Sequence, residues 1–225
     1  HSIDVDGNEA SPPGELDAGV VYWRVFSRYA GQVGEAPSPV WQVNVGVRSA
    51  PVQTSWGTVT DVNGDGHADV VVGAPGASRV YVYLGSERGL RDGSDSVTTL
   101  TGVDDTDFGY AVASAGDVNG DGFGDIIVGA PRANSESGVA YIYTGGPEGL
   151  SSEPLSALEG RDERGQFGRS VAGIGDFNGD GRSDVAVGAP NAFDSGRAYL
   201  FLGDDEGVDE TPIAIEGTGT ISGMF

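Results

Sequence analysis

The stretch DVNGDGFGDIIVGAP, from Asp117 to Pro131, occurs three times in this chain of 225 residues. The other copies are DVNGDGHADVVVGAP, from Asp61 to Pro75, and DFNGDGRSDVAVGAP, from Asp176 to Pro190. Their starting points lie 56 and 59 residues apart, so the chain is built from a long internal repeat. Each copy joins a loop rich in side-chain oxygens directly to an apolar run.

The loop has the composition of a cation site. Asp117, Asn119 and Asp121 alternate along the chain, so their side chains can converge if the loop curls at Gly122. Asp125 closes the loop at its ninth position. All of these residues offer hard oxygen donors, which suit Ca²⁺ with its 6–8 oxygen ligands better than the smaller Mg²⁺ site. Zn²⁺ prefers nitrogen and sulfur ligands, which the loop lacks.

The loop begins like an EF-hand but continues differently. An EF-hand needs a bidentate Glu at its twelfth position, where this chain has Val72, Val128 and Val187. These valines lie in β-branched runs that predict buried strands. An Asx-rich turn without metal is the alternative, because Asp, Asn and Gly favour turns. Nine aspartates in three loops favour the cation, since clustered carboxylates repel one another unless an ion screens them.

Composition excludes several classes of partner. The net charge is −22, from 34 acidic and 12 basic residues, which argues against nucleic acid and against an anionic membrane surface. The sequence has no Cys, so no disulfide is expected, and no apolar stretch long enough for a transmembrane helix. The 39 Gly residues are typical of many short strands joined by tight turns.

The repeats predict an all-β fold of four-stranded units. Each repeat has a strand before the loop and a buried strand ending in Gly-Ala-Pro. An alternating third strand and a weaker fourth strand follow. The third strands are expected at 79–85, 139–145 and 197–203, and the fourth at 96–102, 155–160 and 212–217. Four short strands per repeat of this length indicate the blades of a partial β-propeller. Aromatic residues that alternate on the third strands are expected to pack between blades.

Two further motifs identify a family. Phe108-Gly109 and Phe167-Gly168 each precede a loop, and Gly-Ala-Pro follows every loop. This order resembles the FG-GAP repeat of the integrin α-subunit β-propeller and its bacterial relatives. The resemblance implies Ca²⁺ in each loop, with the ligands Asp61, Asn63, Asp65 and Asp69; Asp117, Asn119, Asp121 and Asp125; and Asp176, Asn178, Asp180 and Asp184. It also implies that the backbone carbonyls of His67, Phe123 and Arg182 complete the three sites.

The chain departs from the family pattern in two places. Trp56-Gly57 replaces Phe-Gly in the first repeat and precedes Asp61 by only five positions, so the first strand of that blade is expected to be short. Residues 216–225 begin a fourth repeat that stops at Phe225. Closed propellers have 4–8 blades, so about three blades predict a fragment, an open arc or part of an oligomeric ring. We therefore expect self-association through an open blade face that carries Phe201 and Ile215.

Residues 1–50 are expected to form a separate β segment with a linker, ahead of the repeats at 51–225. Leu16, Gly19 and Tyr22 resemble the tyrosine corner of a fibronectin type III-like sandwich, of which only the last hairpin would be present. The strands are expected at 20–29 and 41–47, joined by a turn-rich connection at 31–39. The blades are expected at about 56–102, 103–160 and 161–217, followed by the start of another repeat at 218–225.

The resemblance implies a non-enzymatic, extracellular adhesion module whose partner is a protein or a surface glycan. Two alternatives stay open, namely the non-catalytic propeller of a larger secreted enzyme and a rigid surface spacer. The catalytic inventory is poor, because the only histidines are His1 and His67. Acidic groups around Asp104 and Asp204 could supply a carboxylate pair, although such groups in loops are usually solvated.

Overall fold

The structure is a computed structural model that describes residues 60–91 and 97–216, and the backbone of four strands between residues 19 and 45. Among these four strands, β1 (Gly19–Trp23) pairs with β4 (Trp41–Val45), and β2 (Phe26–Tyr29) pairs with β3 (Gln32–Pro37). The expected connection at 31–39 therefore contains a strand, and the expected strand at 20–29 is divided in two. Leu16 and residues 46–59, which include the expected linker, lie outside the described residues.

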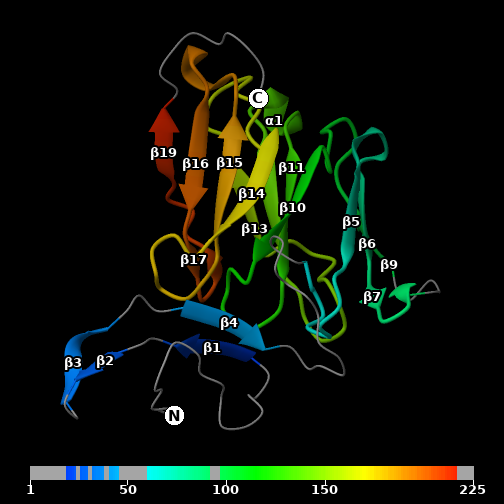
Figure 1. Cartoon of the computed structure of the whole chain (residues 1–225). Coiled ribbons are helices and arrows are strands. Elements are labelled where there is room, and N and C mark those ends of the chain that lie inside the picture. The colour runs from blue at the N-terminus through cyan, green and yellow to red at the C-terminus, as the bar shows by residue number, and fades with distance from the viewer. Residues whose placement is uncertain are drawn as a thin grey trace.

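Three antiparallel sheets follow, one for each repeat (Figure 1). The first consists of β5 (Val70–Ala74), β6 (Arg79–Tyr83) and β9 (Val97–Thr101). The second consists of β10 (Ala111–Gly116), β11 (Asp125–Ala130), β12 (Val139–Tyr143) and β13 (Ser156–Glu159). The third consists of β14 (Ser170–Gly175), β15 (Asp184–Ala189), β16 (Arg197–Phe201) and β19 (Ile213–Glu216).

These sheets confirm the partial β-propeller expected from the repeats. We call them blades 1, 2 and 3, and within each blade the strands pair in the order in which they occur in the sequence. The first strand expected in blade 1, together with Trp56, falls outside the described residues. Small two-stranded ribbons follow the third strands of blades 1 and 3, with β7 (Gly85–Ser86) and β8 (Gly89–Leu90) in blade 1 and β17 (Gly203–Asp204) and β18 (Gly207–Val208) in blade 3.

The second strand of blades 2 and 3 is an inner strand of its sheet, which explains its unbroken apolar sequence. All six residues of β11 are buried, because this strand pairs on both sides and is covered on both faces. In blades 2 and 3 a bulge just before the aspartate loop shifts the pairing register between the first and second strands. The shift lies between Ser114 and Gly116 in blade 2 and between Gly173 and Gly175 in blade 3. The bulge turns the chain out of the sheet at the point where the loop begins.

Helical structure within the described part of the chain is confined to one short turn per blade. These turns are η1 (Pro75–Ala77), α1 (Ala133–Glu136) and η3 (Ala192–Asp194), each placed between the second and third strands. Accordingly, the described residues contain no helix of the length and apolar character that a membrane span requires.

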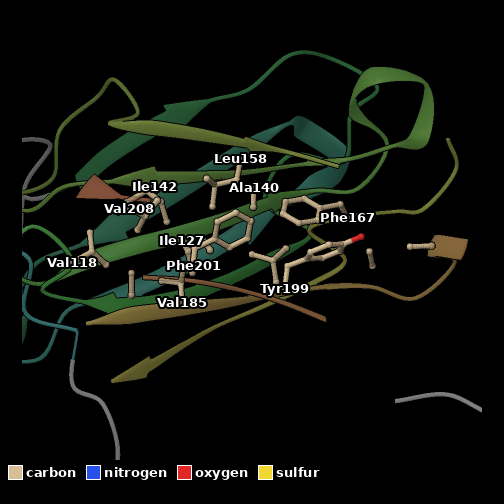
Figure 2. Packing of buried hydrophobic residues seen from close by; sticks show 14 residues of the cluster. Val118, Ile127, Ala140, Ile142, Leu158, Phe167, Val185, Tyr199, Phe201 and Val208 are labelled. Carbon is tan, nitrogen blue, oxygen red and sulfur yellow. The ribbon is translucent and has the colours of Figure 1, made fainter. Parts of the chain in front are cut away.

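The core consists of two clusters, one between blades 1 and 2 and one between blades 2 and 3. Phe167 packs at the centre of the second cluster, with ring centroids 5.5 Å from Tyr199 and 6.0 Å from Phe201 (Figure 2). Phe108 makes the matching contacts with Tyr141 and Tyr143 in the first cluster, at 5.6 and 6.3 Å. Each set of rings comes from one blade, and the expected packing between blades is seen in the clusters, which contain Tyr143, Tyr199 and Phe201 together with residues of the neighbouring blade. Phe201 is buried in this way, so the expectation that it lies on an open blade face was wrong.

The glycines of the two sequence motifs lie where adjacent blades touch. A Cβ atom on Gly129, in the Gly-Ala-Pro of blade 2, would lie 1.9 Å from the carbonyl oxygen of Gly168. A Cβ atom on Gly73 would lie 2.0 Å from the carbonyl oxygen of Gly109 in the next blade. The Gly168 amide in turn donates to the Gly188 carbonyl of its own blade, at 3.1 Å. At both boundaries, therefore, glycines of the two motifs bring the backbones of adjacent blades into direct contact. This contact sets how closely successive blades approach.

Candidate metal centre

The aspartate loops of blades 2 and 3 connect the first and second strands of their blades, and the loop of blade 1 leads into β5. In blade 2 the loop runs from Asp117, directly after β10, to Asp125, the first residue of β11. Gly120 and Gly122 adopt φ values of 74° and 93° within it. This left-handed region is strained for residues with a Cβ atom, so the two glycines allow the loop to curl tightly.

Hydrogen bonds hold the side chains of the central loop toward its own backbone. Asp117 accepts the amides of Asp121 and Gly122, at 3.0 and 2.9 Å. Asn119 accepts the Asp121 amide at 3.1 Å and donates its side-chain amide to the Asp121 carboxylate at 2.9 Å. Asp121 accepts the Phe123 amide at 2.9 Å. The donor oxygens of positions 1, 3 and 5 are therefore ordered by the loop itself.

The other two loops repeat this pattern position by position. Asp61 accepts the amides of Asp65 and Gly66, at 3.1 and 2.9 Å. Asp176 accepts the amides of Asp180 and Gly181, at the same two distances. The amides of His67 and Arg182, at position 7, are each 2.9 Å from the aspartate at position 5. The three sequence copies are thus three copies of one local structure.

The aspartate at position 9 holds the loop to the rest of the blade. One carboxylate oxygen of Asp125 accepts the Val118 amide at 2.8 Å, and the other accepts the Gly145 amide at 2.9 Å. Asp69 makes the same two bonds with Val62 and Gly85, both at 2.7 Å. In blade 3, Asp184 accepts the amides of Phe177 and Gly203, at 2.6 and 2.8 Å. This residue joins the loop to the turn that follows the third strand.

Burial makes negative charge costly in the first two loops. Desolvation raises the pKa of Asp125 to about 7 and that of Asp69 to about 6, although the backbone amides that each accepts oppose the rise. Desolvation also raises the pKa of Asp61 and Asp117, and the nearby carboxylates of Asp65 and Asp121 add to it. A bound cation would offset both the lost hydration and the repulsion between carboxylates.

Successive loops are connected to one another across the blade boundaries. The Gly124 amide donates to the Asp61 carbonyl at 2.9 Å, and the Ser183 amide donates to the Asp117 carbonyl at 2.8 Å. The side chain at position 7 also lies over the preceding loop. A Cβ atom on Gly64 would be 3.1 Å from the Phe123 ring, and one on Gly120 would be 3.6 Å from Nε of Arg182. The three loops therefore form one row along an edge of the arc.

The donor set fits a hard cation in its chemistry, since each loop offers carboxylate and amide oxygens together with a backbone carbonyl at position 7. Over residues 60–91 and 97–216, however, no three His, Cys, Asp or Glu side chains come together as a group able to hold a metal ion. Positions 1, 3 and 5 of each loop lie together, whereas the carboxylate at position 9 is directed at two backbone amides. The fifteen residues expected as ligands remain a prediction.

Other titratable residues considered from sequence lie outside any comparable arrangement. His67 is half-buried within its loop, where its amide is bonded to Asp65. Asp107 lies 3.3 Å from Nε of Arg132, and Asp205 pairs with Arg182. Asp204 accepts the amide of Glu206. The acidic groups around Asp104 and Asp204 thus include ion pairs and a turn contact.

Comparison with known proteins shows to which family the repeats belong. A model of the FG-GAP repeat matches residues 54–83, 108–143 and 167–201, which cover the loop and the two central strands of every blade. The chain contains three FG-GAP repeats. Its three FG-GAP units coincide with blades 1 to 3, so the resemblance inferred from the Phe-Gly and Gly-Ala-Pro motifs is confirmed.

Several integrin α-subunits are similar to this chain. Integrin alpha-6 of Gallus gallus is 39% identical over 140 residues, which are 58% of this chain and 13% of the relative. Integrin alpha-5 of Xenopus laevis is 35% identical over 167 residues, or 68% of this chain and 15% of the relative. Integrin alpha-2 of Bos taurus is 37% identical over 143 residues, or 57% and 12%. The chain therefore spans 12% to 15% of the length of these relatives.

Sequence reasoning missed one set of residues at the candidate centre. Gly85, Gly145 and Gly203 follow the third strands and donate their amides to the aspartates at position 9. These glycines recur two residues after each alternating strand, a signal that the sequence alone contains. Its meaning depends on a contact between segments 16 to 20 residues apart, which the loop sequence alone does not specify.

Proposed function

We propose that each of the three aspartate loops binds one Ca²⁺ ion and that the ion stabilises the blade. One observation carries this proposal: the same hydrogen-bonded frame around the same oxygen donors occurs in all three FG-GAP repeats. The residues that would hold the ion are Asp61, Asn63, Asp65, Asp69 and the His67 carbonyl, and their counterparts in the other two loops. The ion would supply positive charge to carboxylates whose raised pKa reflects costly burial.

The cation would have a structural role under this proposal. Each loop leads into the second strand of its blade, and the aspartate at position 9 connects it to the turn after the third strand. Extracellular modules bind Ca²⁺ with dissociation constants of about 10⁻⁴–10⁻³ M, so the millimolar Ca²⁺ outside cells would load such loops. An ion bound only by the folded state raises stability by mass action.

We further propose that the chain is a non-enzymatic, extracellular interaction module with a protein ligand. The similar proteins are integrin α-subunits, and the resemblance implies adhesion at the cell surface. The net charge of −22 supports a partner other than nucleic acid or an anionic membrane. Loops between strands are the usual binding elements on a rigid β scaffold. A saturable, Ca²⁺-dependent interaction with a cell-surface protein would separate this function from that of an inert spacer.

Replacing Asp121 with alanine tests the calcium proposal. Titration calorimetry should count three Ca²⁺ ions in the wild type and two in the variant. The rise in melting temperature on adding Ca²⁺ should also be smaller in the variant. When the free Ca²⁺ concentration is 100 times the dissociation constant, binding at one site adds about 2.7 kcal/mol to the free energy of unfolding. The variant should lose this contribution from the central loop. The variant should also lose some stability in EDTA, since Asp121 accepts the Phe123 amide.

Glu148→Ala is the matched control, because it removes one negative charge from the exposed turn of the same blade. It should bind three Ca²⁺ ions and show the same calcium-induced stabilisation as the wild type. The calcium proposal is wrong if the wild type binds no Ca²⁺ at millimolar concentration. It is equally wrong for the central loop if Asp121→Ala binds three ions.

A further inference from the structure

The three aspartate loops share one hydrogen-bonded frame, and the blade 1 loop (residues 61–69) has a cationic contact added to it. In every loop the aspartate at position 5 accepts the side-chain amide of the asparagine at position 3, at 2.8–3.0 Å, and the backbone amide of position 7, at 2.9 Å. In the blade 1 loop this aspartate is Asp65, and the Oδ2 atom that accepts Asn63 also accepts Nη2 of Arg91 in a salt bridge. A guanidinium group therefore lies directly on one of the predicted calcium ligands.

The backbone position of Arg91 is repeated in the other blades, but its side chain is not. The Arg91 amide donates to the Leu84 carbonyl at 2.9 Å, just after β8. Ser151 and Asp209 make the equivalent bond in blades 2 and 3, each at 2.8 Å. Blade 2 thus has a neutral residue, and blade 3 an acidic residue, where blade 1 has a cation.

Arg91 also connects the blade 1 loop to the turn after β6. Its Nε donates to the Gly85 carbonyl at 3.0 Å, and the Gly85 amide donates to Asp69 at 2.7 Å. The guanidinium group thus joins position 5 of the loop to the same turn that position 9 contacts. Arg91 therefore supplies this part of the blade with both a positive charge and a connection, the two contributions proposed for a bound ion.

The contact changes the surroundings of the aspartate at position 5. Asp65 is half-buried, whereas Asp121 and Asp180 are exposed in their loops. The guanidinium stays charged over the whole ordinary pH range and offsets the negative charge of the carboxylate. A Ca²⁺ ion that enters the blade 1 loop would have to displace Arg91 from Asp65 or tolerate a second positive charge beside it.

Arg182 provides a contrast at the blade 2 loop (residues 117–125). Its Nε lies near this loop, 3.6 Å from the position of a Cβ atom on Gly120, but its guanidinium group pairs with Asp205 of blade 3. The charge of Arg182 is therefore balanced outside the loop. The equivalent side chain over the blade 1 loop is the uncharged Phe123. A cation bonded to a predicted ligand thus distinguishes the blade 1 loop from the blade 2 loop.

We propose that Arg91 is a built-in counter-cation of the blade 1 loop, that is, a positive side chain that balances its carboxylates. It stabilises this loop without Ca²⁺, and it makes the loop a weaker Ca²⁺ site than the blade 2 loop. The first effect depends on the ion pair alone, whereas the second rests on the proposed calcium binding. The two loops would therefore fill at different Ca²⁺ concentrations, although they have the same side chains at positions 1, 3, 5 and 9.

Nuclear magnetic resonance on the isotope-labelled chain can follow each loop separately during a Ca²⁺ titration at physiological salt. The Gly66 and Gly122 amides each donate to the first aspartate of their own loop, at 2.9 Å, so their signals report on blades 1 and 2. In the wild type, the midpoint for Gly66 should lie at about tenfold higher Ca²⁺ than that for Gly122, because the ion pair and the charge of Arg91 must both be overcome. Arg91→Ser gives blade 1 the residue that blade 2 has, and it should bring the two midpoints together.

The reciprocal variant places the cation at the blade 2 loop. Ser151→Arg should raise the Gly122 midpoint by about tenfold and leave the Gly66 midpoint unchanged. Ser151→Ala is its control, because it loses the same hydroxyl contacts with Glu153 without adding a charge. Arg88→Ser is the control for Arg91→Ser, since it removes an equal charge from the exposed turn between β7 and β8. Both controls should keep the midpoints of the wild type.

Thermal unfolding in EDTA tests the stabilising effect without any ion. Arg91→Ser should melt about 2–4 °C below the wild type, and Arg88→Ser should melt with the wild type. At saturating Ca²⁺ the difference for Arg91→Ser should narrow, because the ion then supplies the missing positive charge. Arg91→Gln, which keeps a long side chain without the charge, is the second variant should Arg91→Ser fail to fold.

The outcomes separate this inference from the calcium proposal. If the blade 1 loop fills at the same Ca²⁺ concentration in the wild type and in Arg91→Ser, the inference is overturned while calcium binding stands. An unchanged melting temperature of Arg91→Ser in EDTA would also overturn it. If neither Gly66 nor Gly122 responds to millimolar Ca²⁺ in any variant, the calcium proposal and the graded filling are overturned together.

Discussion

Replacing Gly129 with alanine is expected to lower the free energy of unfolding by about 3 kcal/mol, near the upper end of the usual overpacking range. The added Cβ atom would lie 1.9 Å from the Gly168 carbonyl oxygen of the next blade, a distance that no real Cβ contact allows. The obstacle is backbone, so no side-chain rotation can relieve it. Blades 2 and 3 would have to separate, which would loosen the packing around Phe167 and Tyr199.

Thermal unfolding will measure this effect as a fall in melting temperature of roughly 6–12 °C for a chain of this size. Gly146→Ala is the matched control in the same blade, because a Cβ atom there would meet nothing closer than 3.7 Å. The control should melt within about 2 °C of the wild type. Equal melting temperatures for Gly129→Ala and the wild type would show that the Gly-Ala-Pro motif does not fix the spacing between blades.

Replacing Asp125 with alanine is expected to destabilise the chain by about 2–4 kcal/mol, whether or not Ca²⁺ is present. The buried amides of Val118 and Gly145 would lose their shared acceptor, at a cost of about 1–3 kcal/mol each. Removing a carboxylate whose pKa is raised by burial offsets part of that cost. The loop and the turn after β12 would then no longer be held together.

Unfolding in EDTA is the decisive measurement for Asp125, since it removes any contribution from the ion. Asp125→Asn should be destabilised less than Asp125→Ala, because its side-chain carbonyl can still accept one of the two amides. Asp104→Ala replaces an exposed aspartate outside the loops and should unfold like the wild type. If Asp125→Ala loses stability only in Ca²⁺, the carboxylate acts through the ion alone. The inference that its two hydrogen bonds hold the loop to the turn after β12 would then be wrong.

Local sequence was sufficient to predict the elements of each blade. The buried run after each loop, the alternation in the third strand and the Gly-rich turns act over a few residues. They therefore predicted β11, β12 and β13 and their counterparts to within a residue or two. The tight curl of the aspartate loop could also be predicted, because Gly120, Gly122 and the short polar side chains set it locally.

The N-terminal strands show where local signals misled. The segment at 31–39 contains Gly and Pro and predicted a connection, yet β3 (Gln32–Pro37) pairs there with β2. Strand formation in that segment depends on a partner strand, and pairing can override weak β propensity. The alternation Val20–Tyr29 similarly predicted one strand, although two different partners divide it into β1 and β2.

The sequence by itself determined the repeat, the blade topology and the oxygen donors of each loop, because these follow from periodicity and turn chemistry within one repeat. Only the tertiary structure decided the roles that require two distant segments to meet. It showed that Asp125 holds the Gly145 amide, that Gly129 contacts Gly168, and that Phe201 faces blade 2 while Ile215 is exposed. Alternation along a strand defines two faces, but only packing against a neighbouring blade determines which face is buried.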